Sequence, residues 1–209
     1  MNNDKIILHL CADIGSDSYP FYRAGYDVRL IGKEIGVEGF VPPANVYGVF
    51  ANPVCTEFSF AKWKHNEGKG NHEEGMFLVN HCLRIIEQCN PDFWVIENPA
   101  NGRLKDFLGK PKMTYEPWHF GDPWTKRTAL WGKFNIPVRI YNIYDDVPKN
   151  KKLYMRPGRS KPGFAFLHKS AIDNIDSLKQ FKHKVNDDMS FRSLCPQGFA
   201  NAFYQANKL

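Results

Sequence analysis

Short apolar runs that alternate with polar loops constrain the fold of this chain most strongly. Strands buried on both faces of a parallel sheet appear in a sequence as continuous apolar runs. The first two runs enclose the short helical pattern "YPFYRAGY", which gives strand, loop, helix and strand in order. We therefore predict an α/β fold with a doubly wound, mostly parallel sheet. The five expected strands are KIILHLCA (5–12), YDVRLIG (26–32), VYGVFANP (46–53), FWVIENP (93–99) and TALWGKF (128–134).

Two further segments have helical patterns, and two have none. Residues 73–89 begin with acids, which favour the first turn of a helix, and they place apolar side chains on an amphipathic face. These apolar residues are Phe77, Leu78, Leu83, Ile85 and Ile86. "GFANAFYQANK" near the C-terminus predicts a closing helix. Residues 56–72 are polar, and the pattern weakens again from Asn135 onward.

Composition limits the classes of protein that this chain can belong to. With 209 residues and 43% hydrophobic content, we expect one domain over residues 1–209. Five widely spaced cysteines without a CxxC pair indicate reduced thiols, and His72 and His81 lack a zinc-binding spacing. No signal peptide or membrane span is apparent, so we expect a cytoplasmic protein. The net charge of +6 is compatible with a polyanionic partner.

Three loops with unusual chemistry follow the predicted strands, namely "CADIGSDS", "NPVCTEFS" and "IENPANGR". Ligands of such sheets bind at the carboxyl ends of the strands, where these loops would meet. Cys55 could act as a nucleophile there if a helix N-terminus or a cation lowers its pKa. Burial could raise the pKa of Glu97 enough for its carboxyl group to donate a proton. The pair suits covalent attack on a ring that is protonated at another atom.

These loops carry a resemblance to a known family. The chain resembles DNA cytosine (carbon-5) methyltransferases, of the compact kind found in phages and mobile elements. "LHLCADIGSDSYPFYRAGYDV" is similar to the cofactor loop of the family, "ANPVCTEFS" to its Pro-Cys motif and "VIENP" to its Glu-Asn-Val motif. "FGDPWTKRTALWG" and "RSLCPQGFANAF" resemble two later motifs, and all five occur in the family's order.

The resemblance implies a reaction and its residues. The Cys55 thiolate would add to carbon 6 of a flipped cytosine while Glu97 binds ring nitrogen 3, and carbon 5 would then accept a methyl group from S-adenosylmethionine. Asn98 would orient Glu97, and Arg127 would hold the base or its phosphate. The residues expected to contact the cofactor are Asp13, Gly15, Ser16, Glu34, Asn52 and Pro53.

The resemblance also implies DNA as the partner. Residues 135–191 would form a reduced recognition or insertion region, too short for a full target recognition domain. Basic side chains there and beside the arginine motif would contact phosphates, which positions a protein without reading sequence. They are Lys126, Lys151, Lys152, Arg156 and Arg159.

The chain departs from the family at two places that leave alternatives open. Asp13 stands where the cofactor loop usually has its first glycine, and the second strand ends in Ile31, Gly32 and Lys33 without the acid that usually binds ribose. One alternative is a catalytically silent relative that binds nucleic acid or S-adenosylmethionine. Another is the same chemistry on RNA or on free cytidine nucleotides.

Overall fold

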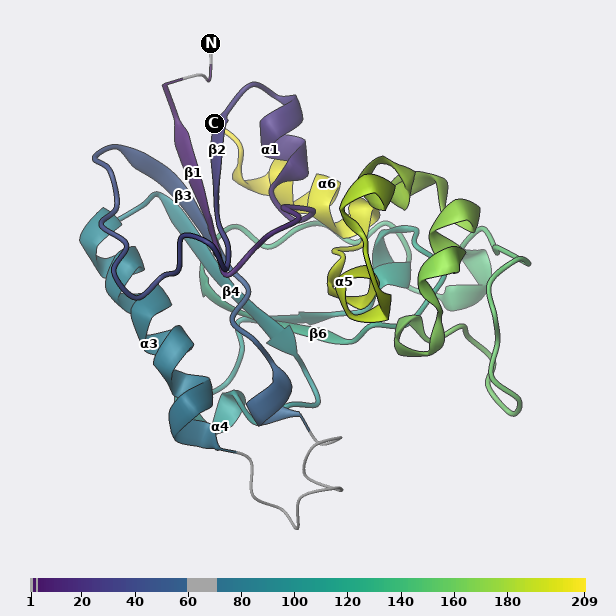
Figure 1. Ribbon diagram of the computed structural model, residues 1–209. Coiled ribbons are helices and arrows are strands. Elements are labelled where there is room, and N and C mark those ends of the chain that lie inside the picture. The colour runs from purple at the N-terminus through teal and green to yellow at the C-terminus, as the bar shows by residue number, and fades with distance from the viewer. Residues whose placement is uncertain (1, 3, 60–70) are drawn as a thin grey trace.

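The structure is built on a six-stranded sheet of order β2-β1-β3-β4-β6-β5 (Figure 1). The computed structural model describes residues 2, 4–59 and 71–209, so most of the polar segment 56–72 lies outside the described residues. β1 to β4 are parallel, whereas β6 runs antiparallel to both β4 and β5. The strands are β1 (Ile6–Leu10), β2 (Asp27–Ile31), β3 (Val46–Ala51), β4 (Phe93–Pro99), β5 (Met113–Tyr115) and β6 (Thr128–Lys133).

Helices cover both faces of the sheet (Figure 1). α3 (His72–Cys89) packs on one face, and α1 (Tyr19–Arg23) and α6 (Gln197–Asn207) pack on the other. Successive strand residues point to opposite faces, so Ile7 joins the core under α1 and α6 while Leu8 joins the core under α3. The predicted α/β class with a mostly parallel sheet is confirmed.

α3 is the longest helix in the described part of the chain. The side chain of its N-cap, Asn71, accepts the backbone N–H of Glu74 at 3.2 Å, and Asn90 ends the helix in the left-handed conformation at φ +43°. The expected apolar face is partly wrong, because Phe77 is 50% exposed. The buried residues of α3 are Gly75, Val79, Cys82, Ile85 and Ile86.

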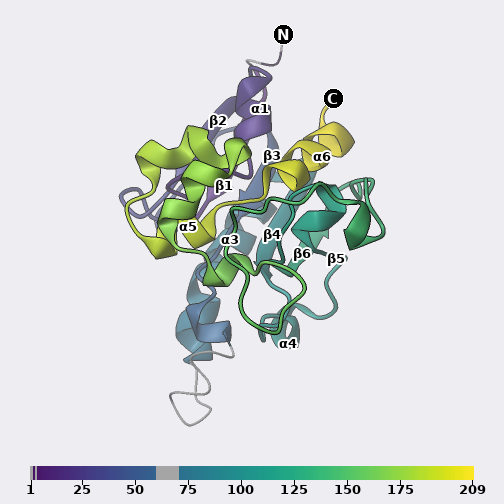
Figure 2. The same ribbon diagram turned by 90° about the vertical axis from the view of Figure 1, so that its right-hand side faces the viewer.

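Residues 144–193 form a helical lobe beside the sheet, which the weak pattern after Asn135 did not predict (Figure 2). Trp124, Phe164 and Phe191 lie at the centre of its hydrophobic core, and Phe164 stacks on both other rings. The core also contacts Ile14 from the loop after β1. The lobe consists of short 3₁₀ helices at Tyr144–Asp146, Phe164–Phe166, Lys169–Asn174 and Asp176–Lys184, followed by α5 (Asp188–Ser193).

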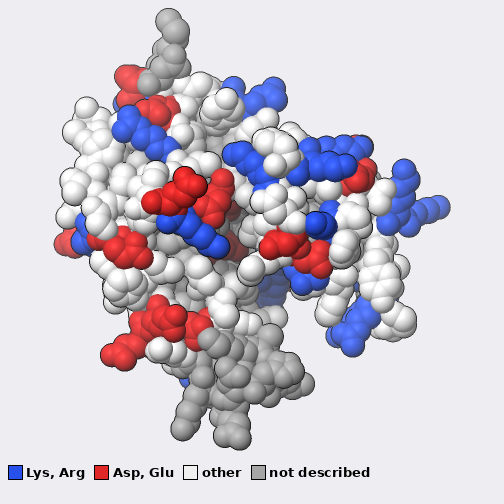
Figure 3. Space-filling model, in the orientation of Figure 1, with Lys and Arg blue, Asp and Glu red and all other residues white. Residues whose placement is uncertain are grey.

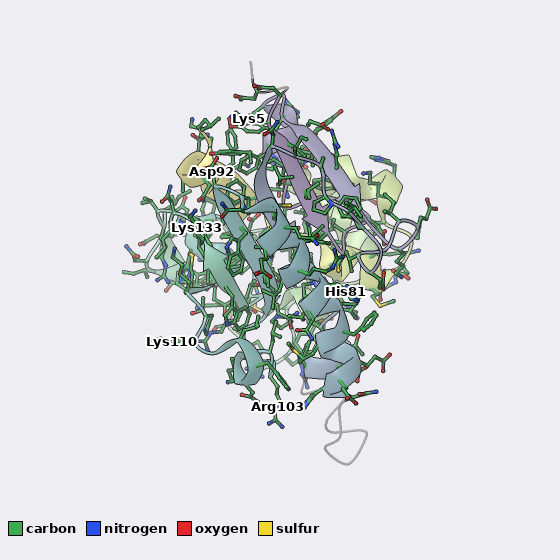
Figure 4. All side chains as sticks on the ribbon, turned by 90° about the vertical axis from the view of Figure 1, so that its left-hand side faces the viewer. Lys5, His81, Asp92, Arg103, Lys110 and Lys133 are labelled. Atoms are coloured by element: carbon green, nitrogen blue, oxygen red, sulfur yellow. The ribbon has the colours of Figure 1, made fainter. Side chains whose placement is uncertain are left out.

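The carboxyl ends of the four parallel strands share one edge of the sheet. In Figure 4, Lys5 and Asp92 mark the opposite edge, next to the amino ends of β1 and β4, while Arg103 follows the carboxyl end of β4. Because β6 is antiparallel, its amino end lies with the carboxyl ends of its neighbours. Residues just before Thr128 therefore lie at the same edge of the sheet as the loops that follow the parallel strands. Within the described residues, no helix is long and apolar enough to cross a membrane.

Candidate active site

The strand register brings Cys55 and Glu97 to the same edge of the sheet. Ala51 of β3 pairs with Leu10 of β1 and with Ile96 of β4, so the residues that follow each of them stand at one level. The Nδ2 group of Asn98 donates to the carbonyl oxygen of Pro53 at 3.0 Å, which ties the end of β4 to the segment that leads to Cys55. Asn98 is 1% exposed.

The Cys55 thiol is half-buried at the start of the 3₁₀ helix Thr56–Phe58. Burial raises the pKa of Cys55, the charge of Glu97 raises it further, and the charge of Lys126 lowers it. The expectation that its surroundings lower the pKa of this thiol is therefore wrong in net direction, although a cation is present. A helix of three residues has too few aligned peptide dipoles to compensate for burial.

Glu97 has the properties of a proton donor. Burial is the main cause that raises its pKa to about 7, and the negative charge of Asp17 adds to it, whereas Lys126 and a hydrogen bond from Asn52 oppose it. At neutral pH a large fraction of Glu97 is then protonated. In that state Glu97 no longer opposes ionisation of Cys55.

A chain of buried and partly buried hydrogen bonds leads to Glu97. His9 of β1 is 1% exposed, and burial lowers its pKa. Its Nδ1 lies 2.8 Å from the Ser18 hydroxyl, and its Nε2 lies 2.8 Å from Asn52 Oδ1. The other end of the amide, Asn52 Nδ2, lies 3.3 Å from Asp17 Oδ1 and 3.4 Å from Glu97 Oε2. The loop after β1 and the tip of β4 are thus joined through one amide.

The loop after β1 is also fixed from the C-terminal part of the chain. The buried Ser16 Oγ accepts the backbone N–H of Cys195 at 2.9 Å. Gln197 Nε2 donates to the carbonyl oxygens of Ser16 and Cys195, both at 3.0 Å. Gly15 turns the loop at φ +79°, where a side chain would meet Leu30. Ser16 therefore holds the loop in place, and its hydroxyl also donates to Asp17 Oδ2 at 3.4 Å.

Asp13 reaches the carboxyl end of β2, where the sequence lacks an acid. Its Oδ1 accepts the backbone N–H of Lys33 at 3.0 Å, and a Cβ on Gly32 would lie only 1.9 Å from the same oxygen. Gly32 thus makes room for the carboxylate. Glu34, the expected substitute for the missing acid, is exposed.

Lys126, and not Arg127, has its charge at the Cys55–Glu97 pair. The ammonium group of Lys126 donates to the carbonyl oxygen of Leu194 at 2.8 Å, and its charge acts on both Cys55 and Glu97. Arg127 is exposed, and its charge lowers the pKa of Glu116.

The remaining expected nucleic-acid contacts lie on the helical lobe. In Figure 3, Lys and Arg side chains gather on the part of the surface that the lobe forms. The expected residues are all exposed there, namely Lys151, Lys152, Arg156 and Arg159. They are apart from Cys55 and Glu97 in the chain. Among residues 4–59 and 71–209, no three His, Cys, Asp or Glu side chains are grouped as metal ligands.

Sequence reasoning missed Asp17, His9 and Gln197 as parts of the site. A histidine inside the apolar run "IILHL" is the one clear signal, because a buried imidazole requires hydrogen-bond partners nearby. Asp17 had no such signal, since an acid in a Ser- and Gly-rich loop is typical of an ordinary turn.

Comparison with known proteins gives one informative similarity. Over 95 residues, the chain is 28% identical to a protein of Frog virus 3 (isolate Goorha) named "Probable DNA (cytosine-5)-methyltransferase". The match covers 40% of this chain and 44% of the viral protein, so the chain matches less than half of that relative's length. No protein-family model matches the chain.

Proposed function

We propose that this protein transfers a methyl group from S-adenosylmethionine to carbon 5 of cytosine in DNA, through a covalent bond between Cys55 and carbon 6. The juxtaposition of the Cys55 thiol with a Glu97 carboxyl group whose pKa is about 7 supports this function best. The similarity to a viral protein named as a cytosine-5 methyltransferase, over part of each chain, is independent support.

Each residue of the pair has a defined part in the reaction. The Cys55 sulfur loses its proton to solvent and bonds to carbon 6, while the protonated Glu97 carboxyl gives its proton to ring nitrogen 3, so that the electron pair moves to carbon 5, which then takes the methyl group. Lys126 stabilises the negative charge that passes between the thiolate and the carboxylate. Loss of the carbon-5 proton to a solvent base then releases the sulfur, and Glu97 recovers its proton. Asn98 holds the Cys55 segment against β4 throughout.

The loop after β1 fits a cationic cofactor with a ribose. S-adenosylmethionine supplies an electrophilic methyl group when bound. Asp13, over the end of β2, can accept hydrogen bonds from ribose hydroxyls, since its Oδ1 is positioned by a backbone N–H. Asp17 supplies a carboxylate at the other end of the same loop, which suits a sulfonium or ammonium group. Asn52 and Pro53 lie at the adjacent tip of β3.

The decisive experiment is covalent capture. DNA that carries 5-fluorocytosine should form a stable adduct with the wild type and S-adenosylmethionine, because the carbon-5 fluorine cannot leave as a proton. Cys55→Ala should form none. Cys89→Ala is the matched control, since it removes a half-buried thiol on α3 and should leave the adduct yield unchanged. Equal capture by Cys55→Ala would contradict the proposal.

The substrate is tested in parallel by transfer of labelled methyl groups. Duplex DNA, single-stranded DNA, RNA and dCMP are each incubated with the protein and labelled S-adenosylmethionine. We expect label in DNA. Label in RNA or dCMP alone would assign the same chemistry to a different substrate, and label in none of them would remove the enzymatic function.

We further infer that residues 135–191 contact the DNA backbone through Lys151, Lys152, Arg156 and Arg159. A Lys151→Gln, Lys152→Gln variant should bind DNA less tightly and should lower the slope of log affinity against log salt by about 0.9 for each phosphate that is no longer neutralised. The control variant is Lys110→Gln, Lys133→Gln, on the α3-covered face of the sheet (Figure 4). Equal slopes for the two variants would contradict this contact surface.

A further inference from the structure

The geometry points to a function for Asp17 that neither the motifs nor the comparison assigns: we propose that Asp17 is a positioning residue that keeps the proton on Glu97, with the Asn52 amide as the link between the two carboxyl groups. This inference rests on the proposed function, because a protonated Glu97 matters only if it donates to a substrate. Its physical basis is the hydrogen-bond chain that runs from Ser18 to Glu97.

The orientation of the Asn52 amide follows from its neighbours. A carboxylate only accepts hydrogen bonds, so the group that faces both Asp17 and Glu97 has to be the NH₂ of Asn52. Asn52 Oδ1 then faces His9, whose Nε2 carries the hydrogen and donates to it. His9 Nδ1 lies 2.8 Å from the Ser18 hydroxyl, which also lies 3.3 Å from the carbonyl oxygen of Gly15. The amide is held from behind and cannot turn away from the two carboxyl groups.

Asp17 and Glu97 flank one partly buried amide, and the negative charge of Asp17 favours the protonated form of Glu97, whereas the hydrogen bond from Asn52 opposes it. Like charges held close together in a poorly solvated site disfavour ionisation of both groups. The Asp17 side chain is 12% exposed, and the loop that carries it is fixed through Ser16. Glu97, at the tip of β4, also lies beside the thiol that becomes negative in the reaction. The proton therefore resides on Glu97, the member of the pair that faces the substrate.

Several other titratable groups lie around Glu97 and also affect its pKa. Lys126 opposes the effect of Asp17, since its positive charge favours the ionised carboxylate. The other groups that act on Glu97 directly, or through Asn52, are Cys55, Tyr115, Cys195 and His9. The charge of Asp17 also acts on His9, whose Nε2 lies 3.8 Å from Asp17 Oδ2, and on Tyr115 and Cys195. A variant that keeps this charge is therefore needed to assign a change in the titration of Glu97 to Asp17.

The test is an NMR titration of the full chain with ¹³C-labelled glutamate carboxyl groups, in which Glu97 is assigned from its loss in Glu97→Gln. We expect a midpoint near 7 in the wild type. In Asp17→Asn the midpoint should fall by about one pH unit, a tenfold loss of proton affinity. Asp17→Glu keeps the charge and should retain the wild-type midpoint. Asp13→Asn is the matched control, because it removes a carboxylate of the same loop that bonds to Lys33 instead.

The outcomes separate this inference from the proposed function. An unchanged or higher Glu97 midpoint in Asp17→Asn overturns the inference, even if DNA is methylated. A lower midpoint supports it, even if no substrate is methylated, in which case only the proposed function fails. If methyl transfer occurs, the alkaline limb of its pH–rate profile should move down by the same interval in Asp17→Asn. If Asp17→Asn folds poorly, Asp17→Ser replaces it, and the Glu97 midpoint should fall in that variant too.

Discussion

The Asn98 side-chain amide donates to the Pro53 carbonyl oxygen at 3.0 Å, and this bond joins the tip of β4 to the segment that carries Cys55. Asn98→Ala leaves that oxygen without its donor in a buried environment. We expect a loss of about 1–3 kcal/mol in the free energy of unfolding and slower covalent capture of 5-fluorocytosine DNA. Urea titration and the rate of adduct formation measure the two effects. Asn101→Ala, at an exposed position just beyond β4, should change neither; equal losses in both variants would mean that the bond is unimportant.

Glu97→Gln should stabilise the protein in a pH-dependent way. Folding raises the pKa of Glu97 from 4.5 to about 7, so the folded state binds this proton more tightly than the unfolded state. The wild type therefore loses stability as the pH rises through this window, and the glutamine variant does not. The variant's advantage should grow by about 3 kcal/mol as the pH rises from 4.5 through 7 and then level off.

Urea unfolding at pH 4.5, 6 and 8 tests this expectation. Asp122, whose pKa is also raised to about 7 by burial, titrates in the same window but is common to both proteins, so its contribution cancels. Glu73→Gln, on the exposed first turn of α3, serves as the control and should show a constant difference from the wild type. A flat difference for Glu97→Gln would show that the carboxyl group is not desolvated.

Lys126→Met should make Cys55 less reactive. The positive charge of Lys126 lowers the pKa of Cys55, so its removal raises that pKa and reduces the thiolate fraction at pH 8. We expect alkylation by iodoacetamide to slow several-fold, up to about tenfold for one pKa unit. Glu97→Gln should have the opposite effect, because the charge of Glu97 raises the pKa of Cys55. Mass spectrometry of the Cys55 peptide measures both rates, with Lys110→Met as the control; changes in the same direction would refute the electrostatic account.

Gln197→Ala should loosen the loop after β1. The buried Gln197 amide donates to the carbonyl oxygens of Ser16 and Cys195, and both lose their donor in the variant. We expect faster hydrogen exchange in residues 13–18 and a loss of about 1–3 kcal/mol in unfolding free energy. Gln205→Ala, on an exposed position of the same helix, tests whether any effect comes from α6 itself. Unchanged exchange in residues 13–18 would mean that other contacts hold the loop.

The sequence predicted those parts of the fold that have a strong local pattern. Four parallel strands, α1, α3 and α6 follow from apolar runs and helical periodicity. β5 has only three residues, Met113–Tyr115, which is too short for any period to appear. The helical lobe was missed because 3₁₀ turns bury scattered positions such as Ile172 and Phe181 without a regular repeat.

The positions of the candidate site residues were predictable only for reactive side chains in or directly after a strand with a clear apolar pattern. Cys55 and Glu97 follow β3 and lie in β4, so their common edge could be inferred. Lys126 lies at this edge because β6, which it precedes, runs antiparallel to β4. An apolar run predicts a strand but does not indicate its direction. The sequence also did not reveal that the pKa of Cys55 is raised. Burial is the main cause, and the degree of burial depends on the packing of segments that are distant in the chain.

The bond from Cys195 to Ser16 spans 179 positions of the chain. During synthesis on the ribosome, the loop that follows the first strand lacks this partner until Cys195 has been translated. A nascent chain can assemble β1 to β4 and still hold an incomplete loop. We therefore expect this loop to reach its final packing only after the sheet has formed.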